Sequence, residues 1–156
     1  PALVVFATVY YMFRQYIDGQ LRLKGMEIQQ KKGERNLPVR MQAYERLALL
    51  CERIRVTNLF YRLNQKSLHR ESLAQAMLVS VQKEFEHNLS QQIYVSDNLW
   101  AIIVLAKDET IAIINESMTE EGDYFLALNR RNQMRQSDPI DQALTAIRKE
   151  AAFYLS

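Results

Sequence analysis

The stretch that decides the fold is SDNLWAIIVLAKDETIAIINESM, residues Ser96–Met118 of this 156-residue chain. From Leu99 to Ala106 it is apolar without interruption, and a helix that is hydrophobic on every side is enclosed by other helices. Ser96 is a favoured N-cap residue, and Asp97 complements the helix dipole in the first turn. We therefore predict a central helix here, with Trp100 as its largest buried anchor.

Outward from this segment, apolar residues recur at spacings of three and four, which predicts amphipathic helices. Asp138 followed by Pro139 is typical of an N-cap and a first helical position, so a last helix begins there. Other helices are predicted over residues 39–55, 68–95 and 124–135. The predicted fold class is all-α, with an N-terminal transmembrane or juxtamembrane helix (residues 1–32) followed by a compact helical bundle (residues 33–156).

The predicted helix over residues 39–55 turns one face inward, and its single cysteine, Cys51, lies on that face. One cysteine excludes an internal disulfide and fits a reducing compartment. Core packing explains Cys51 better than nucleophilic chemistry, which needs exposure and basic surroundings. The inner face comprises Ala43, Tyr44, Leu47, Leu50, Cys51 and Ile54.

The first thirteen residues carry no charge and are predicted to anchor the chain in a membrane. A membrane-crossing helix needs about twenty apolar residues. Because the chain begins at Pro1, we expect a preceding segment to complete the span. The anchor residues are Val4, Val5, Phe6, Val9, Tyr10, Met12 and Phe13. The alternatives are a buried N-terminal helix and the tail of an uncleaved signal sequence.

A basic collar follows the anchor. Residues 14–40 carry seven basic and three acidic side chains, whereas residues 41–156 carry thirteen and fifteen. Basic residues beside a span mark the cytoplasmic side. The nearly neutral remainder argues against nucleic acid as a partner and leaves membrane lipid as the expected contact. The collar comprises Arg14, Arg22, Lys24, Lys31, Lys32 and Arg35, and Arg40 closes it.

Polar residues interrupt the apolar stripe of the helix predicted over residues 68–95. At 100° per residue, Asn88 and Gln92 point toward the core and Glu84 lies on the flank, one turn from Asn88. Buried amides need hydrogen-bond partners, since an unsatisfied one costs about 1–3 kcal/mol. We predict a buried polar network of Glu84, Asn88 and Gln92.

Glu84 and His87 also form a Glu-x-x-His pair, which is half of a di-iron carboxylate site. The only other histidine, His69, has no glutamate three residues before it, so a metal-binding enzyme domain is the alternative rather than the main interpretation. The chain has no Gly-rich phosphate loop, nucleophile elbow or paired-cysteine motif, and we expect no catalytic residue, metal or cofactor. Three arginines, Arg130, Arg131 and Arg135, are expected to form a solvated helix end, and contact with phosphate or an acidic partner is the alternative.

Two strings carry a resemblance: LPVRMQAYERLALLCERI at Leu37–Ile54 and EFEHNLSQQIYVSDNLW at Glu84–Trp100. They resemble an uncharacterised bacterial family of small helical proteins with one N-terminal transmembrane segment. The resemblance runs from the anchor to about Met118 and leaves the tail from Glu120 outside. It implies a single-pass protein of the bacterial inner membrane with most of the chain in the cytoplasm, and it implies no activity.

These observations predict a non-catalytic, membrane-tethered adaptor or accessory subunit of an inner-membrane complex. Its partners are expected to be other subunits of that complex, and self-assembly into a membrane scaffold is an alternative. The last helix carries one apolar stripe that suits a partner's groove. The partner-binding candidates at its end are Phe153, Tyr154 and Leu155.

Overall fold

The structure is a computed structural model that describes residues 12, 14, 15, 37–64 and 69–155. The chain divides into two compact units, Pro1–Val39 and Arg40–Ser156. Every regular element in the described ranges is a helix, which confirms the all-α class. Across the same ranges, no helix combines the length and apolar character that crossing a bilayer requires. Apart from Met12, the predicted anchor residues lie outside the described residues.

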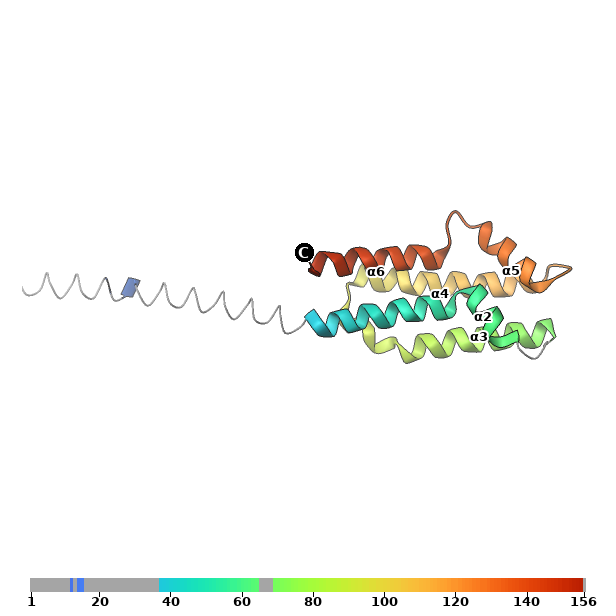
Figure 1. Ribbon diagram of the computed structural model, residues 1–156, viewed down its shortest axis with the longest axis horizontal. Coiled ribbons are helices and arrows are strands. Elements are labelled where there is room, and N and C mark those ends of the chain that lie inside the picture. Colours follow the sequence, from blue (N-terminus) through green and yellow to red (C-terminus); the bar gives the residue numbers. More distant parts are fainter. Residues whose placement is uncertain (1–11, 13, 16–36, 65–68, 156) are drawn as a thin grey trace, which may run out of the picture. The chain divides into compact units, whose positions relative to one another are not determined.

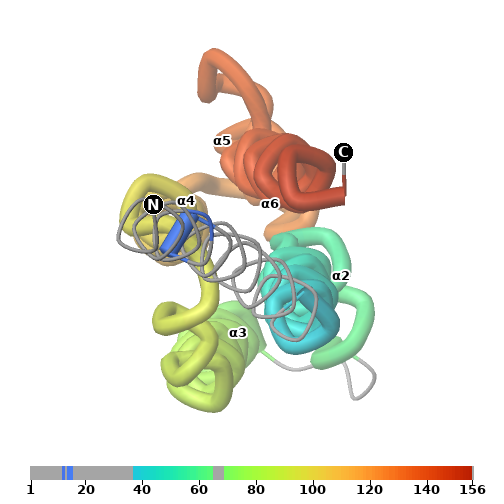
Figure 2. The backbone as a smooth tube through the Cα atoms, turned by 90° about the vertical axis from the view of Figure 1, so that its left-hand side faces the viewer, coloured from blue at the N-terminus to red at the C-terminus, as the bar shows by residue number. Residues whose placement is uncertain are grey.

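The second unit is a bundle of helices that run side by side (Figure 1). Its first helix covers residues 37–54, and Figure 2 shows the helices of the bundle end on. The elements that follow are α2 (Val56–Leu63), α3 (Arg70–His87), the 3-10 helix η2 (Leu89–Tyr94), α4 (Asp97–Met118), α5 (Tyr124–Gln133) and α6 (Pro139–Leu155).

The core forms where the apolar stripes of these helices meet, because burying them removes apolar surface from water. The inner face predicted for the first helix is confirmed, and all six of its residues are buried. Cys51 is one of them, and burial raises the pKa of its thiol to about 12. Opposite this face lie Met77 and Val81 of α3, Leu99, Ile103, Ile113 and Ile114 of α4, and Leu144 and Ile147 of α6.

The predicted central helix is confirmed as α4, which contacts α2, α3, α5 and α6. Ser96 caps it, because its hydroxyl accepts a hydrogen bond from the backbone N–H of Leu99 at 3.1 Å. The prediction of complete enclosure is wrong on one face, where Leu105 is 56% exposed. Trp100 is only half-buried and stacks on Phe85, with 5.5 Å between ring centroids.

The long helix predicted to reach Val95 ends instead at His87, and Asn88 explains why. The Asn88 side chain donates to the carbonyl of Glu84 at 2.8 Å, the group that the Asn88 backbone N–H would bind in a continuing α-helix. That N–H instead binds the Phe85 carbonyl at 3.0 Å, three residues back, and the chain tightens into η2.

This change of period overturns part of the predicted polar network. Asn88 is buried as predicted, but Gln92 is exposed and Gln91 is buried in its place. A 3-10 turn has three residues rather than 3.6, so a phase counted from α3 no longer applies beyond Asn88. Ile93, predicted on the inner stripe, is 71% exposed for the same reason.

The last helix begins as predicted, with the Asp138 carboxylate accepting from the backbone N–H of Ile140 at 2.8 Å. Its apolar stripe packs into its own bundle, since Ile140, Leu144 and Ile147 are buried. The stripe as a whole is therefore not available to a partner. Within α6, the large apolar side chains that are exposed lie in the last turns of the helix.

Candidate docking surface

Arg40 joins two segments at one end of the bundle. Its Nε donates to the backbone carbonyl of Tyr94 in η2 at 3.0 Å, and its guanidinium carbon lies 3.7 Å from the ring centroid of Tyr154 in α6. A cation over an aromatic face is attracted by the negative charge of the ring face. Arg40 thus holds η2 and the end of α6 in a fixed relation.

Glu150 of α6 connects its own helix to the helix over residues 37–54 and to the start of α4. Its carboxylate accepts from the Tyr44 hydroxyl at 3.0 Å, the Ser96 backbone N–H at 2.9 Å and the Ser96 hydroxyl. The carboxylate therefore lies at the N-terminus of α4, where the helix dipole favours negative charge. Burial and the Glu150 hydrogen bond raise the pKa of Tyr44 to about 12.

Large apolar side chains are exposed at the end of the bundle where Arg40 makes its contacts. Ile93, Phe153 and Leu155 are 71%, 74% and 65% exposed, and the rings of Tyr94 and Tyr154 are partly exposed beside them. The residues come from η2 and from the last turns of α6, which lie at the same end of the bundle (Figure 1). We call this set the apolar end: Ile93, Tyr94, Phe153, Tyr154 and Leu155.

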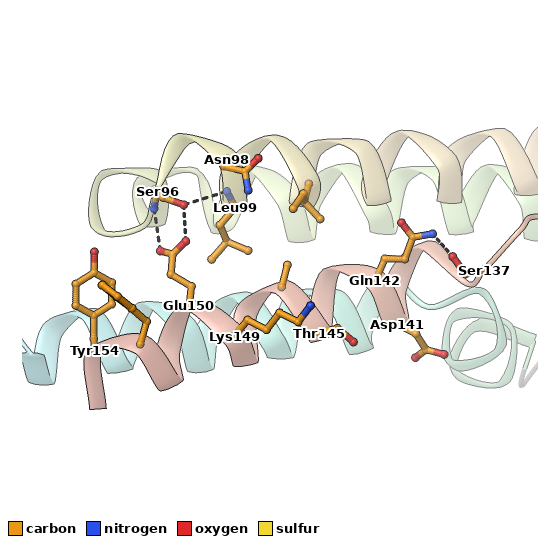
Figure 3. Close-up of a pocket in the computed structure, with 13 residues that line it drawn as sticks. Ser96, Asn98, Leu99, Ser137, Asp141, Gln142, Thr145, Lys149, Glu150 and Tyr154 are labelled. Atoms are coloured by element: carbon orange, nitrogen blue, oxygen red, sulfur yellow. Dashed lines mark hydrogen bonds between the residues drawn. The ribbon is translucent and has the colours of Figure 1, made fainter. Parts of the chain in front are cut away.

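A groove of about 780 Å³ runs between α4 and α6 and reaches the apolar end at Phe153 and Tyr154. Leu99, Ile102 and Ala146 supply apolar walls. Polar groups along the groove already form hydrogen bonds within the protein (Figure 3). Ser96 donates to Glu150, and Gln142 donates to Ser137. The groove therefore offers an apolar wall with a polar margin.

The arginine cluster lies on a different part of the bundle and is not a solvated helix end. Arg135 binds Glu116 through two nitrogens at 3.0 and 3.2 Å and Glu109 at 2.9 Å, which lowers the pKa of Glu116. Arg130 and Arg131 both pair with Glu120. These ion pairs join α5 to the segment after α4, and α4 to the segment before α6.

The structure brings only part of the predicted polar network together. Asn88 contacts Glu84 through the Glu84 backbone carbonyl, whereas the Glu84 carboxylate pairs with Arg53 at 3.1 Å and lies 4.0 Å from Arg62. Gln92 contributes nothing to it, since its side chain is exposed. The observed role of Asn88 is to end a helix.

Glu84 and His87, the pair behind the metal-binding alternative, are not joined by other metal-ligating side chains among the described residues. His87 is exposed, and the Glu84 carboxylate is held by arginines. Over residues 37–64 and 69–155 and the three described positions before them, no group of three or more histidine, cysteine, aspartate or glutamate side chains is arranged to hold a metal ion.

The anchor and collar predictions fall mostly outside the described residues. Met12 and Arg14 are described, and both are helical and exposed. The other anchor residues, Val4, Val5, Phe6, Val9, Tyr10 and Phe13, and the other collar residues, Arg22, Lys24, Lys31, Lys32 and Arg35, lie outside. Phe153, Tyr154 and Leu155 are all exposed at the end of α6.

Sequence reasoning missed Arg40 and Glu150 as structural connections. A signal for Glu150 was present, because it lies between Ile147 and Ala151 on the apolar side of α6, where a carboxylate needs a partner. No local pattern marks Arg40, whose contacts lie 54 and 114 residues away in the sequence.

Comparison with curated proteins and with solved structures found no match. Comparison with protein families matched residues 1–154 to a family of unknown function, DUF7935. The match extends through the tail after Glu120, which the sequence resemblance had left outside, and it confirms the expectation of an uncharacterised family. This chain belongs to DUF7935, a family of unknown function.

Proposed function

We propose that this protein is a non-catalytic, membrane-tethered adaptor or accessory subunit of a bacterial inner-membrane complex. The uncharged residues 1–13 serve as the anchor, and the basic collar after them keeps the bundle on the cytoplasmic side. In this proposal the anchor supplies location and the bundle supplies the surface for other subunits.

The observation that carries the docking role is the groove between α4 and α6. Its apolar walls and polar margin suit an amphipathic helix, which lays its apolar face into such a groove and keeps its polar face in water. The long helices on either side are tied together by Glu150 and Ser96, so the groove keeps its shape without a ligand. A preformed site spends little free energy on ordering when a partner binds.

Groove filling tests this proposal. Thr145 lines the groove and is exposed, so Thr145→Trp places a large ring in it without entering the core. Arg148 is exposed on the same helix and does not line the groove, which makes Arg148→Trp the matched control. Full-length protein of each type is purified from native membranes in mild detergent, and co-eluting proteins are identified by mass spectrometry.

We expect wild type and Arg148→Trp to co-elute in stoichiometric amounts with the same membrane subunits, and Thr145→Trp to lose them. Recovery of the wild type as a monomer without partners would overturn the proposal. Recovery as a homo-oligomer would favour the self-assembling scaffold instead. A partner retained by Thr145→Trp would exclude the groove as the docking site.

A further inference from the structure

We propose that the apolar end rests in the interface of the same bilayer that anchors the chain. The apolar end then contacts phospholipids at the level of their headgroups. This inference rests on the proposed function, because it requires residues 1–13 to lie in a membrane. It adds an orientation to that function, in which the long axes of the helices point away from the bilayer and the α4–α6 groove opens to the side.

The chemistry of the apolar end supports a membrane occupant. Single exposed apolar residues are ordinary on a protein surface, but several that gather in one place mark a contact. Here two aliphatic side chains and one phenylalanine stand beside two tyrosines. Tyrosine prefers the boundary between hydrocarbon and water, where its ring is in apolar surroundings and its hydroxyl stays hydrated.

The apolar end is also held in place before it meets anything. Arg40 bonds the Tyr94 carbonyl and lies over the Tyr154 ring, and the Phe153 and Tyr154 rings contact edge to face at 5.2 Å between centroids. The side chains thus project from a rigid end rather than from a loose tail. Insertion into the interface then needs little ordering of the protein.

The length of the tether limits how far an anchored bundle can lie from the membrane. The 23 residues from 14 to 36 separate the uncharged run from the described helix that begins at residue 37. That length spans at most about 80 Å when extended and about 35 Å as a helix. An anchored bundle therefore meets the bilayer at high effective concentration, so even a weak contact is populated. The basic collar draws the tether toward anionic headgroups.

Site-specific quenching in membranes tests the orientation. Full-length Ile93→Cys is labelled with a fluorophore and reconstituted in vesicles of phosphatidylcholine and phosphatidylglycerol that carry a spin-labelled quencher lipid. The native Cys51 is fully buried and does not compete for label. The matched control is Leu126→Cys, which is 60% exposed on α5 at the opposite end of the bundle (Figure 1). A third variant, Val9→Cys, reports on the anchor.

We expect the lipid quencher to reduce fluorescence at positions 93 and 9 and to leave position 126 unchanged. Quenching at position 9 without quenching at position 93 would overturn this inference and leave the membrane tether of the proposed function standing. Absence of quenching at position 9 would overturn that tether itself. Equal quenching at 93 and 126 would refute the orientation. A label at 93 that is shielded from aqueous iodide but not quenched by lipid would show that protein covers this end, which also overturns the inference.

Discussion

At the scale of single residues, Arg40 and Glu150 hold together segments that are distant in the sequence. Arg40 links η2 and α6, whereas Glu150 links the first helix, the start of α4 and α6. Arg40 uses one hydrogen bond and one cation–π contact, whereas Glu150 accepts three hydrogen bonds. Of the two, Arg40 directly contacts the apolar end, through Tyr94 and Tyr154.

Cys51 is predicted to resist alkylation in the folded protein. Its side chain is fully buried, and burial raises the pKa of the thiol to about 12, so almost none is present as the reactive thiolate at about pH 8. We expect iodoacetamide to modify Cys51 only at the rate at which the protein unfolds, and to modify it fully in denaturant. Mass spectrometry of the modified chain over time measures this. Rapid modification under native conditions would contradict the burial.

Tyr44 is predicted to make stability depend on pH in the alkaline range. The folded protein raises the pKa of Tyr44 from 10.0 to about 12, first by burial and then through the hydrogen bond to Glu150. The stability linked to this proton is complete below about pH 10 and is lost as the pH rises toward about 12. Tyr44→Phe should therefore show a shallower fall in the free energy of unfolding over this range, measured by urea denaturation at several pH values.

The alkaline fall should not vanish in Tyr44→Phe, because burial also raises the pKa of Tyr124 to about 12. Tyr124→Phe is the matched comparison, and each variant should remove its own share of the slope. Identical slopes in wild type and Tyr44→Phe would show that the Tyr44 proton is not held more tightly in the folded state.

At the scale of elements, the end of α3 shows where a periodic pattern stops being informative. The apolar spacing continues past Asn88 in the sequence, but a side-chain hydrogen bond to the Glu84 carbonyl replaces the backbone bond and starts a 3-10 turn. Asparagine often competes with the backbone in this way, so Asn88 is the residue that carried the signal. As a consequence, η2 turns Ile93 outward to the apolar end.

The N-cap of α4 is predicted to couple energetically to Glu150. Ser96→Ala should cost about 1–2 kcal/mol because it removes the cap of Leu99. Glu150→Ala should cost about 1–3 kcal/mol because it leaves the Tyr44 and Ser96 donors without their acceptor. The double variant should cost less than the sum of the two, since either single variant already removes the hydrogen bond from the Ser96 hydroxyl to Glu150. Chemical denaturation of all four proteins measures the coupling.

Asp123 provides the control for this cycle. It caps α5 by accepting from the Leu126 N–H at 2.9 Å, and its side chain is exposed. Asp123→Ala should cost about 1 kcal/mol and combine additively with Glu150→Ala, because no hydrogen bond links these two residues. Additivity for the Ser96 pair as well would contradict the shared contact.

At the scale of the whole molecule, the bundle depends on a core to which the helix over residues 37–54 and the helices α2 to α6 all contribute. Leu47→Ala should therefore destabilise the bundle by about 2–5 kcal/mol, since Leu47 is fully buried and its truncation leaves a cavity. Leu105→Ala removes the same atoms from an exposed site and should change stability by no more than about 0.5 kcal/mol. Urea unfolding followed by circular dichroism measures both, and equal costs would place the core elsewhere.

Sequence patterns alone were enough to predict the helical class, the central helix with its Ser96 cap, the start of α6 at Asp138 and Pro139, and the buried face around Cys51. These follow from spacings and caps within a few residues, which are local properties of the chain.

Three features became visible only in the folded chain: the end of α3, the pairing of Glu109, Glu116 and Glu120 with the arginines, and the hydrogen bonds of Glu150 to Ser96 and Tyr44. Folding also brought Tyr94 of η2 and Tyr154 of α6 into contact with the same side chain, Arg40. Contacts between residues that are far apart in the sequence depend on how helices pack, and packing geometry is not written in the periodicity of any single helix.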